Sequence, residues 1–123
     1  MNPENRRTAL ITGASAGIGE AFAEVFAAEG FDLVITARRE DRLRQVAARL
    51  VERHHVRVEV IVEDLADPHA PARLCAEIAA RGIAIDALVN NAGFGVTGVY
   101  TSADWTRHAA FLQVMVTAVA ELT

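Results

Sequence analysis

The stretch that decides the fold lies near the start of the chain and reads Thr12-Gly13-Ala14-Ser15-Ala16-Gly17-Ile18-Gly19. It follows a short apolar run, Ala9-Leu10-Ile11, and opens an alanine-rich segment whose apolar residues recur at helical spacing. The order is therefore strand, glycine turn and helix. This arrangement presents backbone N–H groups and the positive end of a helix dipole to a phosphate. The alternative is a purely structural glycine turn, but the flanking strand and helix favour the phosphate site.

Beyond this turn, the chain alternates between short apolar runs and amphipathic segments. We expect strands at residues 8–12, 33–35, 56–62 and 85–90. We expect helices at residues 17–29, at 41–53, from about 68 or 71 to 81, and at 102–122. Strict alternation with short connections predicts an α/β fold in which a parallel sheet is covered by helices on both faces. The specific prediction is a Rossmann-type doubly wound sheet with strand order 3-2-1-4.

Helical spacing also predicts which side chains are buried. The first helix is expected to bury Ile18, Phe22, Val25 and Phe26. In the third helix, Cys75 shares the predicted apolar face and is expected to be a buried, inert thiol. The last helix is expected to pack through one stripe, formed by Trp105, His108, Leu112, Met115, Val119 and Leu122.

Composition limits the functional classes. The chain has 123 residues, enough for one domain, and 52% of them are hydrophobic. A net charge of −4 gives no general attraction to nucleic acid or to an anionic membrane. No apolar run is long enough to cross a bilayer, and the first seven residues contain no apolar signal region, so a cytoplasmic location is expected. The four histidines show no metal-ligand spacing.

Three motifs together resemble the short-chain dehydrogenase/reductase family. The first is T-G-x-x-x-G-x-G after the first strand. Asp64-Leu65 after the third strand resembles that family's adenine-contacting element, and Asn90-Asn91-Ala92-Gly93 after the fourth resembles its N-N-A-G element. The resemblance covers about residues 8–93 and implies one partial dinucleotide-binding domain spanning residues 1–123. The candidate cofactor-binding residues are Gly13, Ser15, Gly17, Ile18, Gly19, Arg38, Arg39, Asp64, Leu65, Asn91, Ala92 and Gly93.

The residues after the second strand bear on which dinucleotide binds. In dinucleotide folds an acidic residue at this point holds a ribose 2′-hydroxyl, whereas arginine accommodates a 2′-phosphate. Here the strand is followed by Ala37-Arg38-Arg39, and the forked guanidinium donors suit a phosphate. We therefore predict NADP(H) rather than NAD(H); a solvated helix start is the alternative. Many NADP-preferring family members carry a basic residue just before the middle glycine, and here that residue is Ala16.

Two further polar elements each allow two roles. Asp64 could accept a hydrogen bond from an adenine amino group, or it could cap the helix that follows. The amides of Asn90 and Asn91 can tie neighbouring strands together. The resemblance also implies that the Ala92-Gly93 backbone passes close to the cofactor ribose.

The catalytic residues that the resemblance implies are not recognisable in the sequence. The family's hydride transfer relies on a Tyr-x-x-x-Lys motif with a nearby serine and an asparagine. The single tyrosine is Tyr100, Asp104 stands four residues later, and the chain contains no lysine. Met115 stands where similar sequences carry the asparagine. We therefore predict no catalytic residue and expect the chain to be inactive alone.

The family's domain is about twice this length, so the chain is expected to be a fragment, a frameshifted product, a natural half-domain or a half completed by another chain. We predict a homo-oligomer that associates through the fourth strand and the last helix. The leading hypothesis is an NADP-dependent oxidoreductase of carbonyl and alcohol groups, present as its cofactor-binding half. The alternative is a non-catalytic dinucleotide-fold module that acts through self-association.

Overall fold

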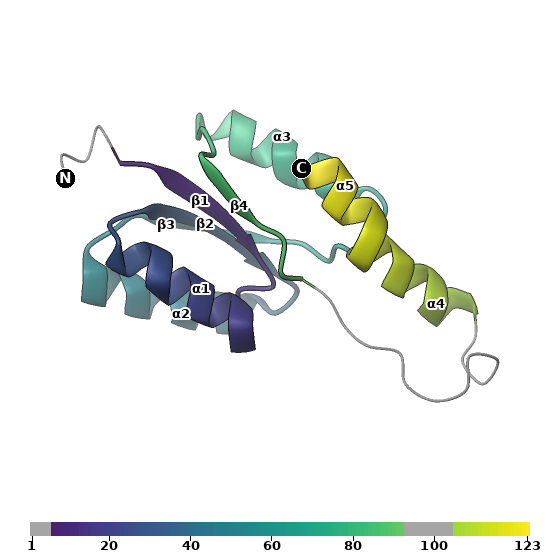
Figure 1. The fold of residues 1–123 in the computed structure, drawn as a ribbon, viewed down its shortest axis with the longest axis horizontal. Coiled ribbons are helices and arrows are strands. Elements are labelled where there is room, and N and C mark those ends of the chain that lie inside the picture. The colour runs from purple at the N-terminus through teal and green to yellow at the C-terminus, as the bar shows by residue number, and fades with distance from the viewer. Residues whose placement is uncertain (1–5, 93–104) are drawn as a thin grey trace.

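The computed structural model describes residues 6–92 and 105–123, and it is a parallel sheet with helices on both faces (Figure 1). The strands are β1 (Thr8–Thr12), β2 (Asp32–Ala37), β3 (Val58–Val62) and β4 (Ala87–Val89). The helices are α1 (Gly17–Ala28), α2 (Glu40–His54), α3 (Ala70–Ala80), α4 (Trp105–Leu112) and α5 (Ala118–Leu122), and a π-helical turn (Gln113–Thr117) joins the last two. The third and fourth strands are each shorter than the sequence predicts.

The strand order is β3-β2-β1-β4, with every pair parallel, so the predicted order is confirmed. Leu10 of β1 pairs with Val34 of β2 on one side and with Leu88 of β4 on the other. The two central strands are buried along almost their whole length. Their continuous apolar runs are typical of strands that are covered on both faces.

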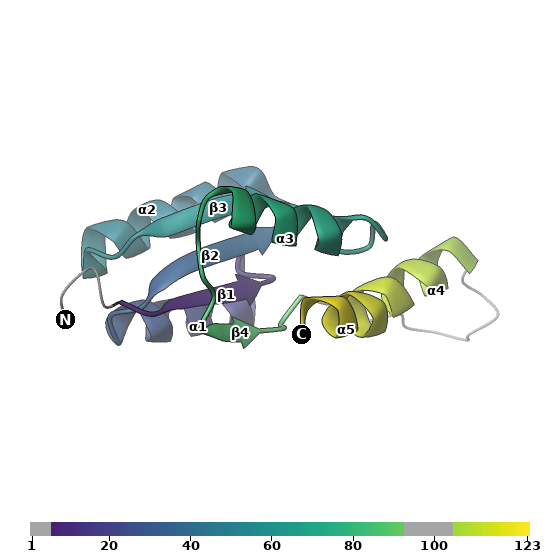
Figure 2. The ribbon, with the colours of Figure 1, turned by 90° about the horizontal axis from the view of Figure 1, so that it is seen from above.

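Helices α1 and α2 cover one face of the sheet, while α3 and the last helical stretch cover the other (Figure 1). Because side chains alternate along a strand, Ile11 and Ile35 point to the first face, whereas Leu10 and Val34 point to the second. Helix α4 extends beyond the carboxyl ends of the strands (Figure 2). In the described part of the chain, no helix combines the length and apolarity that a membrane crossing requires.

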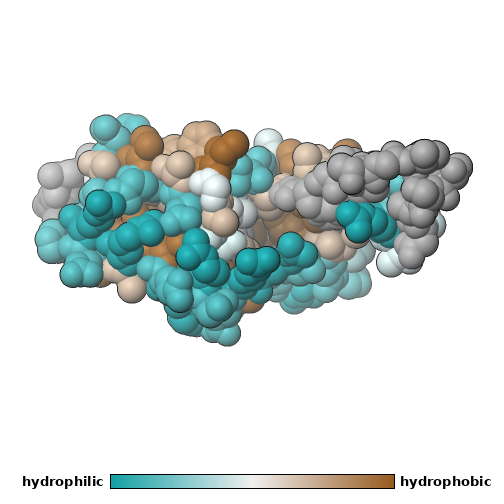
Figure 3. Space-filling view, turned by 90° about the horizontal axis from the view of Figure 1, so that it is seen from below, coloured by the Kyte–Doolittle hydropathy of each residue, from teal (hydrophilic) through white to brown (hydrophobic). Residues whose placement is uncertain are grey.

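The predicted buried face of α1 is wrong. Its buried residues are small, namely Gly19, Ala23 and Ala27, whereas Ile18, Phe22 and Val25 are 70%, 41% and 59% exposed. Small residues let the helix lie close against the strands, and this turns the larger side chains outward. Phe26 is partly buried and meets Phe31 edge to face, with ring centroids 5.0 Å apart. Figure 3 shows that hydrophilic side chains dominate this side of the molecule and that hydrophobic ones form smaller patches among and above them.

The prediction for Cys75 is also wrong, because this thiol is exposed. Helix α3 buries Ala70, Pro71, Leu74 and Ile78. These positions define a face narrower than the one predicted, and Cys75 lies just beside it.

The stripe predicted for the last helix is wrong at three of its six positions. His108 is buried as predicted, Val119 and Leu122 are partly buried, and Leu122 packs against buried side chains of this face. Trp105, Leu112 and Met115 are exposed. The π-helical turn adds a residue to one turn and rotates the following residues relative to a regular helix. The residues buried instead are Gln113, Val114 and Ala118. The predicted start of this helix, Ser102, lies outside the described residues.

Candidate functional site

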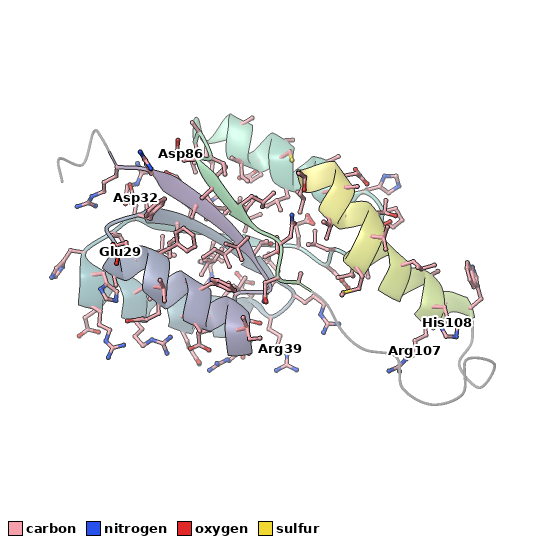
Figure 4. All side chains as sticks on the ribbon, viewed as in Figure 1. Glu29, Asp32, Arg39, Asp86, Arg107 and His108 are labelled. Atoms are coloured by element: carbon pink, nitrogen blue, oxygen red, sulfur yellow. The ribbon has the colours of Figure 1, made fainter. Side chains whose placement is uncertain are left out.

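A pocket of about 320 Å³ opens at the carboxyl ends of the strands, and segments after all four strands line it. In open parallel sheets, ligands bind in this position, next to the point where the strand order reverses. In Figure 4, Arg39 lies at this end of the molecule, whereas Asp32 and Asp86 lie at the opposite end. The lining residues are Gly13, Ser15, Ala16, Thr36, Ala37, Arg38, Arg39, Glu63, Asp64, Leu65, Asn91, Ala92 and Val114.

The three glycines of the turn meet different requirements. Gly13 has φ +66°, and a Cβ there would lie 2.9 Å from Ala92 Cα. A Cβ on Gly19 would overlap the carbonyl oxygen of Gly13, so this glycine allows α1 to pack against the turn. Gly17 has φ +60° and faces open space, with no atom within 4 Å of its Cβ position. Gly13 and Gly19 therefore allow the close approach of neighbouring backbone, while Gly17 meets the positive φ of the turn that leads into α1.

Helix α1 begins without a side-chain cap. Its N-cap residue is Ala16, which makes no side-chain hydrogen bond to the first turn. The first N–H groups of a helix have no partner within the helix, and the helix dipole adds partial positive charge at this end. A helix start of this kind, beside a pocket, is a ready site for an anion.

The ends of β1 and β4 are joined through one hydroxyl. Thr12 Oγ1 accepts hydrogen bonds from the backbone N–H groups of Asn91 and Ala92, both at 2.9 Å, and donates to Val89 O at 3.4 Å. Asn91 Nδ2 donates to Gly13 O at 3.3 Å. The predicted tying role is thus confirmed for Asn91, whereas the Asn90 amide instead donates to Thr123 Oγ1 at 3.3 Å.

The end of β2 brings cationic groups to the pocket. Arg38 and Arg39 are exposed, and neither side chain forms an ion pair within the described part of the chain. Eight other arginines do form ion pairs, namely Arg6, Arg42, Arg44, Arg49, Arg53, Arg57, Arg73 and Arg81. The two guanidinium groups at the pocket are therefore available to an anionic ligand.

Thr36 also belongs to this wall. Its backbone carbonyl accepts a hydrogen bond from Ala14 N at 3.3 Å, which joins β2 to the glycine turn. Its hydroxyl is buried and has no hydrogen-bond partner in the described structure. A buried hydroxyl without a partner is costly, so a ligand group that bonded to it would be favoured.

The end of β3 contributes two carboxylates that have different partners. Glu63 is held by Arg73, whose Nε and NH2 groups lie 2.8 and 3.0 Å from its two oxygens. Asp64 Oδ1 accepts a hydrogen bond from Ala66 N at 2.9 Å and so stabilises the turn directly after the strand. Helix α3 begins later, at Ala70, so Asp64 does not cap this helix. The negative charge of Glu63 is compensated, and Asp64 remains as the polar acceptor of this wall.

Neighbouring charged groups after the end of β3 stabilise one another's ionised forms. The backbone N–H of His69 and the Arg73 guanidinium lower the pKa of Asp67. Glu63 and Asp67 in turn raise the pKa of Arg73 above its ordinary value. These contacts lie on the outer side of the pocket and hold the turn between β3 and α3 in place.

The structure brings most of the predicted site residues together around the pocket. Gly17 and Gly19 lie in the first turn of α1 rather than in the lining, Ile18 points outward, and Gly93 lies outside the described residues. Residues that the sequence analysis did not include are Ala16, Thr36, Ala37, Glu63 and Val114. Thr36, Ala37 and Glu63 flank predicted residues at strand ends, so their position in the chain was a usable signal.

Among the described residues, the pocket lining contains no tyrosine, lysine, histidine or cysteine. Tyr100 lies outside the described residues. Met115 lies in the π-helical turn and is 43% exposed, while its neighbour Val114 faces the pocket. No cluster of metal-ligating side chains occurs among residues 6–92 and 105–123. What the described lining does offer is the exposed guanidinium groups of Arg38 and Arg39 and the uncapped start of α1, which suit an anionic ligand.

Comparison with known proteins identifies the family. The profile of the short chain dehydrogenases matches residues 7–123. The chain belongs to the short-chain dehydrogenase family. Sulfoacetaldehyde reductase 2 of Chromohalobacter salexigens is 41% identical over 87 residues, which are 71% of this chain and 34% of that protein.

Solved structures of other family members agree with this assignment. L-Sorbose reductase from Gluconobacter frateurii, complexed with NADPH and L-sorbose, superposes with a TM-score of 0.89 and 36% identity over 95% of this chain and 44% of that one. A short-chain dehydrogenase from Sphingobium yanoikuyae, in complex with NADPH, gives 0.85 and 40% over 94% and 45%. The Rossmann-type fold is confirmed, and the chain spans less than half the length of these relatives.

Proposed function

We propose that this chain is the cofactor-binding domain of an NADP-dependent short-chain dehydrogenase that interconverts carbonyl and alcohol groups. The observation that carries the cofactor preference is the pair Arg38 and Arg39, which line the pocket without acidic partners. An unpaired guanidinium is suited to a ribose 2′-phosphate because its planar donors match phosphate oxygens. Two of the solved relatives contain NADPH, which supports the same preference.

The other walls of the pocket fit the remaining parts of such a dinucleotide. The uncapped start of α1 and the open space at Gly17 suit the pyrophosphate. Asp64 can accept from the adenine amino group, and the unpartnered Thr36 hydroxyl supplies a further polar contact. Gly13 lies so close to Ala92 that position 13 has no room for a side chain. When bound, NADP(H) supplies or accepts the hydride, and the residues described here bind and orient it.

Titration with NADPH and NADH tests the proposal. We expect NADPH to bind at least about tenfold more tightly than NADH, since losing a charge-assisted phosphate contact costs about 1.5–3 kcal/mol. The double variant Arg38→Ala/Arg39→Ala should lose this preference and keep its affinity for NADH. Arg44→Ala is the matched control, because Arg44 pairs with Glu40 one turn earlier in the same helix. Equal affinity for the two dinucleotides in the unmodified protein would contradict the NADP assignment.

A second function, a binding module that acts through self-association, is favoured by one observation. Large apolar side chains are exposed on α1 and, on the other face of the sheet, on the last helical stretch, including Ile18, Val25, Trp105 and Val116. Each helix thus offers a separate exposed apolar surface, and such surfaces are typical of interaction sites. Sedimentation equilibrium of the Trp105→Ser and Ile18→Ser variants separates the alternatives. A folded protein that binds neither dinucleotide but dissociates on either substitution would favour the module.

A further inference from the structure

Strand β3 is an outer strand of the described sheet and pairs with β2 alone. In the doubly wound order, further strands are added beside the fourth, so β3 stays at the edge in a longer chain too. Arg57 O and Glu63 N, at the two ends of β3, bond to β2. Because backbone groups alternate between the two sides of a strand, those of Val58, Val60 and Val62 point away from the sheet. The strand therefore presents an outward row of N–H and C=O groups.

This outward row matches a second copy of itself. A two-fold axis through Val60 makes the two strands antiparallel and places Val58 opposite Val62 of the second copy, so each outward N–H and C=O group meets a partner. The same register places Arg57 opposite Glu63 of the second copy, and these opposite charges attract. Val62 is 39% exposed, so apolar surface accompanies the backbone groups. An open edge of this kind is prone to pairing between copies.

Arg81, the residue directly after α3, reaches the centre of the row. Its NH1 group donates to Val60 O at 3.5 Å and to Glu59 Oε2 at 3.0 Å, and its Nε donates to Glu77 Oε1 at 2.9 Å. The hydrogen bond to Glu77 and the charges of Glu77 and Glu59 raise the pKa of Arg81, although burial opposes the shift. The guanidinium is thus held in its charged form at the middle carbonyl of the edge.

Two hollows flank the same edge. One, of about 610 Å³, is lined by β3 and α3, and the other, of about 300 Å³, is lined mainly by β3 and α2. Val60 and Arg81 line both hollows. Because Arg81 borders the two hollows and also bonds to the central carbonyl, a strand that pairs with β3 must first displace this side chain.

We propose that Arg81 blocks pairing of β3 with the β3 strand of a second copy, by occupying the Val60 carbonyl and placing a charge where the incoming strand would lie. Charged side chains protect the edge strands of many sheets in this way. The inference does not depend on the proposed function, because neither Arg81 nor Val60 lines the pocket at the strand ends. Its consequence is that loss of one guanidinium opens a defined interface between copies.

Sedimentation velocity over a range of protein concentrations tests the proposal, under reducing conditions because Cys75 is exposed. In Arg81→Ala, an incoming strand no longer displaces a charge-assisted hydrogen bond, so we expect self-association at least about tenfold tighter than in the unmodified protein. Hydrogen exchange read by mass spectrometry should show new protection within residues 58–62 that rises with concentration. Unchanged association, or tighter association without protection of this segment, would overturn the proposal.

Arg57→Ala is the matched control, because Arg57 also pairs with Glu59, at 3.1 Å, and lies at the same edge. It removes the same charge but leaves Arg81 on the Val60 carbonyl, so association should not tighten. An increase equal to that of Arg81→Ala would assign the effect to lost positive charge and refute the blocking role.

Two further variants separate edge pairing from loss of structure. Arg81→Ala/Val62→Lys returns a positive charge to the open edge, so association should fall to within about twofold of the unmodified level. Persistent association of this double variant would place the contact elsewhere and overturn the proposal. If thermal unfolding shows that Arg81→Ala is not folded, Arg81→Met takes its place, because it keeps an aliphatic stem and removes the donors. The same tighter association is expected for it.

Discussion

The two faces of the sheet are packed to different degrees. On the α1–α2 face, the described residues form one continuous cluster of twelve buried apolar residues that reaches from Ala9 to Val56. On the opposite face, the buried residues divide into two smaller clusters, one of five around Leu74 and one of four around Val114. Ion pairs from Glu20 and Glu24 to α2 add to the first face. The first face is therefore expected to be the more resistant to unfolding.

Because the candidate site is anchored on both faces, its parts rest on regions that are packed to different degrees. The glycine turn and the arginines after β2 are anchored on the well-packed face, through Ala14, Thr36 and Arg42. The wall formed by Leu65 and Val114 belongs to the smallest cluster. The phosphate-binding part of the pocket thus rests on the more stable half of the structure, and the part nearest the last helix rests on the less stable half.

The difference in packing between the two faces is tested most directly by making the same substitution on both. Leu50 and Leu74 are both fully buried, one in the large cluster and one in the cluster of five. Truncating a buried leucine to alanine costs about 2–5 kcal/mol, and the cost grows with the cavity left behind. We expect Leu50→Ala to lie near the upper end and Leu74→Ala near the lower end in urea denaturation. Equal losses would contradict the difference between the faces.

A glycine pair tests the turn itself. Gly13 and Gly82 have similar backbone conformations, φ +66° and +70°, but only Gly13 has backbone atoms within contact distance of its Cβ position. Substitution by alanine in this conformation costs about 1–2 kcal/mol, and forced close contact adds about 1–3 kcal/mol. Gly13→Ala should therefore lower the free energy of unfolding by about 3 kcal/mol, roughly twice the effect of Gly82→Ala. Similar effects at the two sites would argue against the close approach of Ala92.

A milder change probes the smallest cluster. Val114→Ala should lower stability by about 1–2 kcal/mol, the value for removing two buried methyl groups. Because the effect falls on the less stable face, amide exchange should accelerate in α5 and remain unchanged in α1. Hydrogen exchange read by mass spectrometry checks this. Uniform acceleration in both helices would show that the two faces unfold as one unit.

The smallest expected effect concerns pH. The hydrogen bond from His54, helped by the nearby positive charges of Arg53 and Arg49, holds the pKa of Glu24 below its ordinary value of 4.5, although burial opposes the shift. A carboxyl whose pKa is lowered by folding stabilises the fold above pH 4.5, and this contribution is lost as the pH falls through the folded-state pKa. Glu24→Gln should therefore flatten the decline of Tm between about pH 5 and pH 3. Glu40→Gln, which alters an exposed pair, should leave the decline unchanged.

The sequence was sufficient for the sheet because its signals are local. Each strand is a short apolar run, and each is followed by a glycine, arginine, aspartate or asparagine element at its carboxyl end. Parallel strands place all these ends at one edge, so the pocket follows once the strand order is known. Gly13, Arg38, Asp64 and Asn91 were predictable on this basis.

Helix faces were harder to predict. In α1 the hydrophobic stripe of Ile18, Phe22 and Val25 is the obvious candidate for burial, yet Ala23 and Ala27 face the strands. Hydrophobicity alone does not report how close a helix must lie to a sheet. A glycine whose Cβ would overlap the turn, as at Gly19, is the better indicator of the buried side.

Long-range polar contacts could not be predicted from the sequence, for a different reason. Arg42 looks like any other charged residue of an exposed helix face, and its partner Ser15 lies 27 positions earlier. Likewise, nothing in the sequence shows that the Thr36 hydroxyl is buried without a partner. The π-helical turn at Gln113–Thr117 changed the phase of the last helix, which no periodic pattern could reveal.

The hydroxyl of Thr12 has a consequence for the order in which the protein folds. It joins β1 to Asn91 and Ala92, which lie 79 and 80 positions further along the chain. Contacts of such long sequence separation close the largest loops, whose entropic cost delays their formation. The β1–β2 unit, by contrast, needs only the segment between neighbouring strands. We therefore expect this wall of the pocket to form late, when β4 docks beside β1, and a nucleotide that requires it would recognise the chain only after the sheet is complete.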